Sequence, residues 1–214
     1  MQTNFWQSVR GDYDLPDKFI NLENGFFCPM PKPILESFVK NIRGVNKISS
    51  YYMRNNQVEA KAAATTMVSN LLGCNEENSL ILTRNTTESL GIILNGIKWQ
   101  KGDELILSSL DYGSMRDISR YLSESRGVKV VVVNPPLCPT SDEQILKEYK
   151  SVFNNRTKYI LIPHIIHLTG QIMPISKICD SAHDSGIKVI VDGAHAVGQT
   201  VSYTHLTLPT NREV

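Results

Sequence analysis

The sequence lacks the cysteine arrangements that mark disulfide frameworks and structural zinc sites. It has four cysteines, Cys28, Cys74, Cys138 and Cys179, and no two of them form a CxxC pair. Scattered cysteines of this kind favour reduced thiols in a reducing compartment. We therefore expect a cytoplasmic protein without disulfides.

Charge of one sign and long apolar runs are also scarce. The formal net charge is +1, which gives no basic surplus for binding nucleic acid or an anionic membrane. No apolar run approaches the roughly 20 residues that cross a bilayer, and residues 1–10 contain no apolar signal-peptide core. We therefore expect neither nucleic acid nor a membrane as a partner.

Three familiar active-site motifs are missing. A dinucleotide-binding GxGxxG motif must follow a strand, but Gly91 and Gly96 lie inside an expected helix. Neither a phosphate-binding GxxxxGKS/T loop nor a GxSxG nucleophile elbow occurs. These absences argue against the nucleotide-binding and hydrolase classes that depend on those motifs.

The sequence does contain alternating helix and strand patterns. With 214 residues, of which 41% are hydrophobic and 20% charged, the chain can bury a sizeable core. We expect an irregular N-terminal arm over residues 1–20 and one domain over 21–200. Apolar spacing and cap residues predict helices at 33–44, 58–72, 86–98, 114–125, 141–152 and 174–185, and strands at 79–83, 104–107, 128–133, 158–162 and 187–191. This order predicts a three-layer α/β fold, a mainly parallel sheet with helices on both faces.

The last segment, residues 201–214, breaks this pattern. Its sequence, VSYTHLTLPTNREV, continues neither a helix nor a strand of the preceding kind. It resembles the read-through translation of a sequencing adapter, and the alternative is a natural polar tail. We set it aside as a non-native tail and expect the chain to be a truncated gene product.

Polar residues follow four predicted strands, at the sheet edge where α/β proteins bind ligands. Thr86 and Thr87 follow the first of these strands, with Asn85 as a helix N-cap and Glu88 three residues later. This is either a well-capped helix or a phosphate site made of helix N–H groups, from which Glu88 must point away. Tyr112, after the second strand, either stacks on a planar ring or packs in the ordinary way.

The other two polar clusters follow the strands at 158–162 and 187–191. His164 and His167 invite a zinc interpretation, but no cysteine or further carboxylate joins them in a recognisable spacing. Asp192 ends an apolar run that predicts a buried strand, and a buried carboxylate needs a partner. Asp192 and His195 are either a capped turn or a functional pair.

With these residues, the chain resembles class V aminotransferases, the fold-type I pyridoxal 5'-phosphate (PLP) enzymes that include cysteine desulfurases and isopenicillin N epimerase-like proteins. The resemblance covers about residues 21–200, and it implies the large domain of a PLP-dependent transferase, here incomplete. It rests on four segments: Asn21 to Gly25, Thr83 to Ser89, His164 to Gly170 and Val191 to Gln199.

The resemblance implies PLP as the cofactor and gives roles to the residues around its ring. Asp192 would pair with the protonated pyridine nitrogen, which keeps the ring an electron sink. His195 would hydrogen-bond the phenolic oxygen, and Tyr112 takes the place of the stacking aromatic. His167 falls where desulfurases commonly have an asparagine near the phenolic oxygen.

The resemblance also places the phosphate and the missing lysine. Thr86, through its N–H, and Thr87, through its N–H and hydroxyl, would hold the phosphate. The family's Schiff-base lysine lies beyond the counterpart of Asp192, where this chain enters its adapter-like tail. Lys188 precedes Asp192 at the start of its strand and should point elsewhere. We therefore expect the 214 residues by themselves to be inactive.

The implied reaction is amino-acid chemistry through an aldimine and a quinonoid intermediate, in a homodimer. Transaminase, epimerase, desulfurase and lyase activities all remain open at this point. Two other classes also remain: a non-catalytic binding module or inert truncated product, and, less favoured, a zinc hydrolase that uses His164 and His167.

Overall fold

The structure, a computed structural model, describes residues 2–74 and 80–199. The chain divides into two compact units, Met1–Asn75 and Glu76–Val214, which are described separately. The adapter-like tail at 201–214 lies outside the described residues, and the domain bounds expected from the sequence stay a prediction.

The first unit is helical, with α1 (Gln2–Gly11), α2 (Lys32–Asn55) and α3 (Gln57–Leu72). The irregular arm expected at residues 1–20 is wrong over α1, because no glycine or proline interrupts residues 2–10. The helix expected to end at Gly44 continues, since Gly44 does not adopt the left-handed conformation of a C-terminal cap. α2 instead changes direction at Ser49, with φ 29° and ψ −105°. Gly73, with φ 66°, ends α3 as predicted.

Neither α2 nor α3 has a buried residue. The helix predicted at 33–44 has apolar residues spaced along one face, and on α2 they are all exposed: Ile34, Leu35, Phe38, Val39 and Ile42. The first unit therefore carries an apolar helix face that its own residues do not cover.

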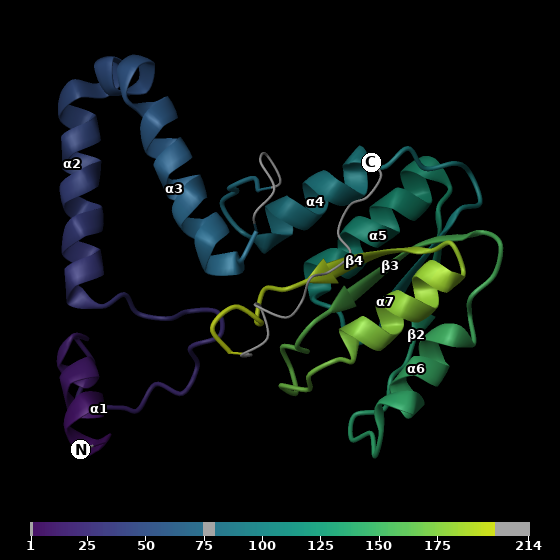
Figure 1. The fold of residues 1–214 in the computed structure, drawn as a ribbon. Helices are drawn as coiled ribbons and strands as arrows, with labels where there is room; N and C mark the ends of the chain where they lie inside the picture. Colours follow the sequence, from purple (N-terminus) through teal and green to yellow (C-terminus); the bar gives the residue numbers. More distant parts are fainter. Residues whose placement is uncertain (1, 75–79, 200–214) are drawn as a thin grey trace. The chain divides into compact units, whose positions relative to one another are not determined.

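The second unit is an α/β fold around a four-stranded parallel sheet (Figure 1). Its strands lie in the order β2-β1-β3-β4. The elements in chain order are α4 (Thr86–Gly96), β1 (Glu104–Ser108), α5 (Gly113–Arg126), β2 (Lys129–Val133), α6 (Asp142–Lys150), β3 (Thr157–Pro163), α7 (Ile175–Asp184) and β4 (Lys188–Asp192). The prediction of a mainly parallel sheet is confirmed.

Alternate residues of the strands face two separate cores. One core joins Ile106, Ile160 and Ile162 to α6 and α7, through residues such as Tyr149 and Ile178. The other joins Leu105, Leu107 and Leu161 to α4 and α5. Figure 1 shows these two helix pairs on opposite faces of the sheet. The three-layer arrangement therefore follows from the two-residue period of side chains along a strand.

The strand expected at 79–83 is wrong over its described residues, 80–83, which form no strand. Ile81 is exposed there, so the apolar alternation does not bury a face. The Thr83 hydroxyl bonds the Asn85 carbonyl oxygen at 3.1 Å and the Ser89 hydroxyl at 2.5 Å. These local bonds draw the segment into the start of α4 instead of a sheet ladder.

α6 begins where the capping pattern predicted, but its cap differs. The Ser141 side chain makes no capping bond. Gln144 reaches past it: its Oε1 accepts the Thr140 N–H at 3.0 Å, and its Nε2 donates to the Thr140 hydroxyl at 2.8 Å. The Gln144 side chain therefore ties the start of α6 to Thr140.

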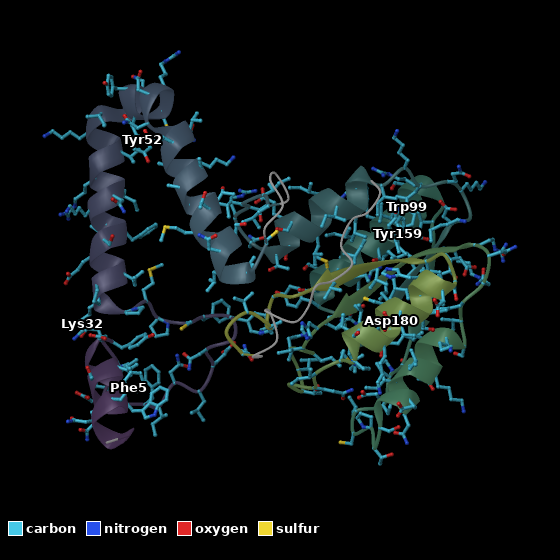
Figure 2. All side chains as sticks on the ribbon, in the orientation of Figure 1. Phe5, Lys32, Tyr52, Trp99, Tyr159 and Asp180 are labelled. Carbon is cyan, nitrogen blue, oxygen red and sulfur yellow. The ribbon has the colours of Figure 1, made fainter. Side chains whose placement is uncertain are left out.

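A ring contact and an ionic cluster link neighbouring elements of the sheet. Trp99, after α4, meets Tyr159 of β3 edge to face, with ring centroids 5.1 Å apart (Figure 2). At the start of β1 the side chain of Glu104 is buried, and its carboxylate accepts bonds from Lys129 Nζ at 2.9 Å and Asn154 Nδ2 at 2.7 Å. These bonds, with the Arg156 guanidinium at 3.7 Å, lower the pKa of Glu104. This ionic cluster joins β1 to β2 and to the turn before β3.

Candidate functional site

The carboxyl ends of β1, β3 and β4 meet at one edge of the sheet, because these strands are parallel and adjacent. Pro163 of β3 is the register partner of Asp192 of β4. The loops that follow the three strands carry Tyr112, His167 and His195. Topology alone therefore brings predicted site residues far apart in sequence to one place.

Asp192 is the last residue of β4 and is half-buried. The Ala194 N–H donates to its Oδ1 at 3.0 Å, and the His164 N–H donates to its carbonyl oxygen at 2.8 Å. Among residues 2–74 and 80–199, no group donates a hydrogen bond to Oδ2 of Asp192. Among the described residues, the carboxylate is thus fixed through one oxygen, and the other has no donor there that a ligand would have to displace.

The expectation that β4 is a buried strand needs correction. β4 pairs only with β3 and is an edge strand of the described sheet, and Ile190 is its one buried residue. The β-branched run at 189–191 is typical of an edge strand as well as of a central strand, so the sequence pattern does not distinguish the two. Asp192 is therefore more accessible than the sequence suggested.

Three aromatic rings from three loops lie together beside Asp192. The rings of Tyr112 and His167 meet edge to face, with centroids 5.3 Å apart. His167 and His195 are stacked at 6.4 Å with an interplanar angle of 17°. Burial, with the nearby His195, lowers the pKa of His167. At neutral pH, His167 is therefore a neutral imidazole that can both donate and accept a hydrogen bond.

The loop at 164–173 holds His167 in this cluster. It is closed by an antiparallel bridge between Ile165 and Ile172, and the Met173 N–H donates to the His164 carbonyl oxygen at 2.9 Å. The buried carbonyl of Ile166 accepts the Gly170 N–H at 2.8 Å. His164 itself is buried, which lowers its pKa. His164 therefore supports the loop from below, whereas His167 is half-buried in the ring cluster and precedes the exposed residues 168–170.

The start of α4 has the geometry expected of an anion site. Asn85 caps the helix by accepting the Glu88 N–H at 2.9 Å. Glu88 turns back to Arg84, whose N–H donates to it at 2.7 Å and whose guanidinium lies at 3.0 Å, and these bonds lower the pKa of Glu88. The Thr87 hydroxyl lies 3.2 Å from the Ser114 hydroxyl of α5. The carboxylate is therefore neutralised by Arg84, and the first-turn N–H groups of Thr86 and Thr87 have no carbonyl acceptor within the helix.

Asp111 is a site residue to which sequence reasoning gave no role. It directly precedes Tyr112, is 4% exposed, and accepts the Ser108 N–H on Oδ2 at 2.7 Å. Burial raises its pKa to about 7, and the negative charge of Asp192 adds to the rise. The signal available in the sequence was an acidic residue three positions after the last residue of a strand, next to an aromatic.

No metal centre is formed by the part of the chain that the structure describes. There, no group of three or more histidine, cysteine, aspartate or glutamate side chains lies close enough to hold an ion. His164 and His167, the pair behind the zinc interpretation, separate into a buried residue and a ring-cluster residue.

Among the described helices, none is both long and apolar enough to cross a bilayer.

Lys188 lies at the far end of β4 from Asp192. It is exposed at the first position of the strand, four residues before the aspartate, and a strand rises about 3.3 Å per residue. The structure places Lys188 at the opposite end of β4 from the site, and that it takes no part in the chemistry stays a prediction.

Comparison with known proteins agrees with this geometry. The family described as Aminotransferase class-V matches residues 29–205. The chain belongs to the class-V aminotransferase family. The resemblance inferred from four sequence segments is thereby confirmed, and PLP is the cofactor of this family.

Members of the family with known names include epimerases and desulfurases. Isopenicillin N epimerase of Streptomyces clavuligerus is 25% identical over 194 residues, 90% of this chain and 48% of that protein. A probable cysteine desulfurase of Vibrio cholerae is 27% identical over 169 residues, 72% of this chain and 41% of that protein. The chain therefore spans about half the length of the curated relatives it matches.

Solved structures share the fold. A cysteine desulfurase of Escherichia coli superposes with a TM-score of 0.73 at 20% identity, covering 94% of this chain and 50% of that one. A cystine C–S lyase gives a TM-score of 0.71 at 20% identity, covering 81% and 47%. The incomplete PLP-transferase domain predicted from the sequence is thus confirmed as the fold.

The residues of the site fit the chemical groups of PLP. A helix N-terminus with two threonines and a neutralised glutamate suits a phosphate. A carboxylate with one available oxygen suits a protonated pyridine nitrogen, and the three rings offer contacts to a planar, hydroxylated aromatic. All these groups lie in the second unit.

Proposed function

We propose that this chain is the cofactor-binding part of a PLP-dependent enzyme that acts on an amino acid. The observation that carries the proposal is the meeting of Asp192 with the Tyr112–His167–His195 ring cluster at the carboxyl edge of the sheet. When bound, PLP supplies an electron sink for charge that develops at the substrate Cα. Each residue then has one task.

The phosphate end is assigned to α4. Thr86 and Thr87 direct backbone N–H groups along the helix axis, where the helix dipole favours a negative charge. The Thr87 hydroxyl, near the Ser114 hydroxyl, adds a neutral donor. Because Arg84 holds Glu88 back, the one carboxylate in the first turn does not repel the phosphate.

The ring end is assigned to the other four predicted residues of the site. Asp192 holds a proton on the ring nitrogen by a charge-assisted hydrogen bond. Tyr112 covers a ring face, as its exposed ring permits. His195 and His167 would hold the phenolic oxygen by hydrogen bonds. A neutral His167 donates a hydrogen bond there without adding a positive charge.

The test is PLP binding by the 214-residue chain, measured by equilibrium dialysis with absorbance. Replacing a charge-assisted bond with a neutral one costs roughly 1.5–3 kcal/mol, so Asp192→Asn should weaken binding about 10- to 100-fold. The matched control is Asp180→Asn, an exposed aspartate on α7 (Figure 2), which should bind as the wild type does. Equal affinities of the Asp192 and Asp180 variants would refute the proposal.

We propose that these 214 residues bind the cofactor without turning substrate over. The support is that the family's lysine lies beyond the counterpart of Asp192, that the chain spans about half of its relatives, and that Lys188 is at the wrong end of β4. Assays for transamination, racemisation and desulfuration should therefore all read as background. Turnover in any of them would contradict this point and would also decide the reaction type.

We also propose that the whole protein is a homodimer and that it is cytoplasmic. The exposed apolar residues of α2 support a homodimer of the whole protein, since a contiguous apolar face is costly in water. Sedimentation of the intact protein at micromolar concentration should give twice the monomer mass. The thiols of Cys28, Cys138 and Cys179, which form no disulfide, support a cytoplasmic location.

A further inference from the structure

Beneath the ring cluster lies a buried polar group of three residues, Ser108, Asp111 and Tyr149, that the assignments above do not use. Asp111 and the backbone of Ser108 form a closed turn: the Ser108 N–H donates to Asp111 Oδ2 at 2.7 Å, and the Asp111 N–H donates to the Ser108 carbonyl oxygen at 3.1 Å. Tyr149 comes from α6, and its buried hydroxyl makes no well-formed hydrogen bond among the described residues, although the Ser108 side chain lies near enough to lower its pKa. Burying a carboxyl group costs stability, so this turn calls for a functional explanation as well as a structural one.

The titratable groups that face Asp111 come from three elements. Asp192 at the end of β4 raises the pKa of Asp111, and Arg116 of α5 lowers it. Burial, and after it the nearness of Asp111, raises the pKa of the Tyr149 hydroxyl, so this group stays neutral. Asp111 and Asp192 are therefore two carboxyls that repel one another when both are ionised and no cation lies between or beside them.

We propose that Asp111 is a positioning residue of the cofactor site, acting through Asp192 to make the site select a ring with a protonated nitrogen. The proposal rests on the assignment of Asp192 to that nitrogen. A cation bound at Asp192 offsets the repulsion between the two carboxylates, so the second carboxylate strengthens binding of the charged ring. It gives no such advantage to an uncharged ring of the same shape.

The same turn gives Asp111 a geometric role. The residue that follows it is Tyr112, whose ring meets His167, and the Met115 N–H then donates to the Tyr112 carbonyl oxygen at 2.9 Å to begin α5. The buried carboxyl thereby fixes the point at which the chain leaves β1. Asparagine in its place keeps an oxygen for the Ser108 N–H and removes only the charge.

The test compares two probes on the intact 214-residue chain at about pH 8: PLP, and its 1-deaza analogue, in which C–H replaces the ring nitrogen. Because Asp111→Asn removes one negative charge near the bound cation and leaves the other charges in place, it should weaken PLP binding about three- to ten-fold. The dissociation constant of the deaza analogue should not change. An equal loss for both probes would show a merely structural role, and no loss for either would show no role; each result overturns the proposal.

Asp192→Asn separates this proposal from the one it rests on. If Asp192→Asn leaves the preference for PLP over the deaza analogue unchanged, the cofactor assignment itself fails. If Asp192→Asn abolishes the preference and Asp111→Asn does not reduce it, only the role of Asp111 fails.

A second measurement uses the wild type, in case Asp111→Asn does not fold. Carbon-13 NMR of labelled aspartate carboxyls should show one that titrates near neutral pH. Its pKa should fall when PLP is added and stay constant when the deaza analogue is added. A pKa that does not respond to PLP overturns the proposal.

Discussion

Replacing Asp111 with asparagine should flatten the dependence of folding stability on pH. In the folded chain, burial holds the pKa of Asp111 at about 7, against an ordinary value of 3.8. The folded state therefore binds this proton more tightly than the unfolded state does. The stabilising contribution is complete below pH 3.8 and is lost as the pH rises through 7.

The magnitude follows from the displacement of the pKa. A change from 3.8 to about 7 corresponds to roughly 4 kcal/mol in the free energy of unfolding, of which about 2.5 kcal/mol is lost between pH 5 and pH 8. Asp111→Asn carries no such titration, so its stability relative to the wild type should rise by about that amount over this interval. Histidines that titrate in the same range affect both proteins and cancel in the difference.

The assay is urea denaturation of both proteins, followed by circular dichroism at about pH 5 and pH 8 without cofactor. The slope with denaturant must match between the two proteins for the difference to be interpreted. A difference that stays constant with pH would refute the reasoning, because it would mean that Asp111 ionises as easily in the folded chain as in water. The outcome does not depend on PLP, so it tests the buried carboxyl by itself.

Three further substitutions test the packing of the second unit. Glu104→Gln should lower the free energy of unfolding by about 1–2 kcal/mol at neutral pH, because Lys129 and Asn154 lose a charged acceptor. This loss should vanish in acid, because the stabilisation by the Glu104 carboxylate disappears as the pH falls through its lowered pKa. Tyr149→Phe should leave the urea midpoint unchanged or raise it, because the buried hydroxyl makes no well-formed hydrogen bond among the described residues, and a loss above about 1 kcal/mol would contradict this. Gly127→Ala should lower the free energy of unfolding by about 1–2 kcal/mol, which is more than Gly186→Ala should. Both glycines have positive φ, but a Cβ at position 127 would lie 3.0 Å from the Lys101 Cγ, whereas one at position 186 would meet nothing within 4 Å. Equal midpoints for these two variants would contradict the steric argument.

The sequence predicted well the elements whose signals are local. The bounds of the helices at α4, α5 and α7 and of all four strands follow from apolar spacing and from glycines that stop helices, such as Gly127, because these depend on a few neighbouring residues. The same local rules failed at residues 80–83, where hydrogen bonds of Thr83 compete with a strand, and at Gly44, where a glycine in a helical conformation does not stop the helix.

The features of the site likewise divide into those predicted from the sequence and those that only the tertiary structure revealed. The sequence alone determined that Asp192 ends a strand and that Tyr112 and His167 lie in loops after parallel strands, and hence that these residues share an edge, since parallel strands place their carboxyl ends together. Thr86 and Thr87 begin α4, and residues 80–83 before them form no strand. Only the tertiary structure decided that β4 is an edge strand, that His164 is buried while His167 joins the rings, and that Glu88 turns back to Arg84. It also revealed Asp111, because the environment that alters a carboxyl is made by residues from three other elements. Neighbours in sequence fix the conformation of a segment, whereas burial and charge at a site depend on residues that only folding brings together.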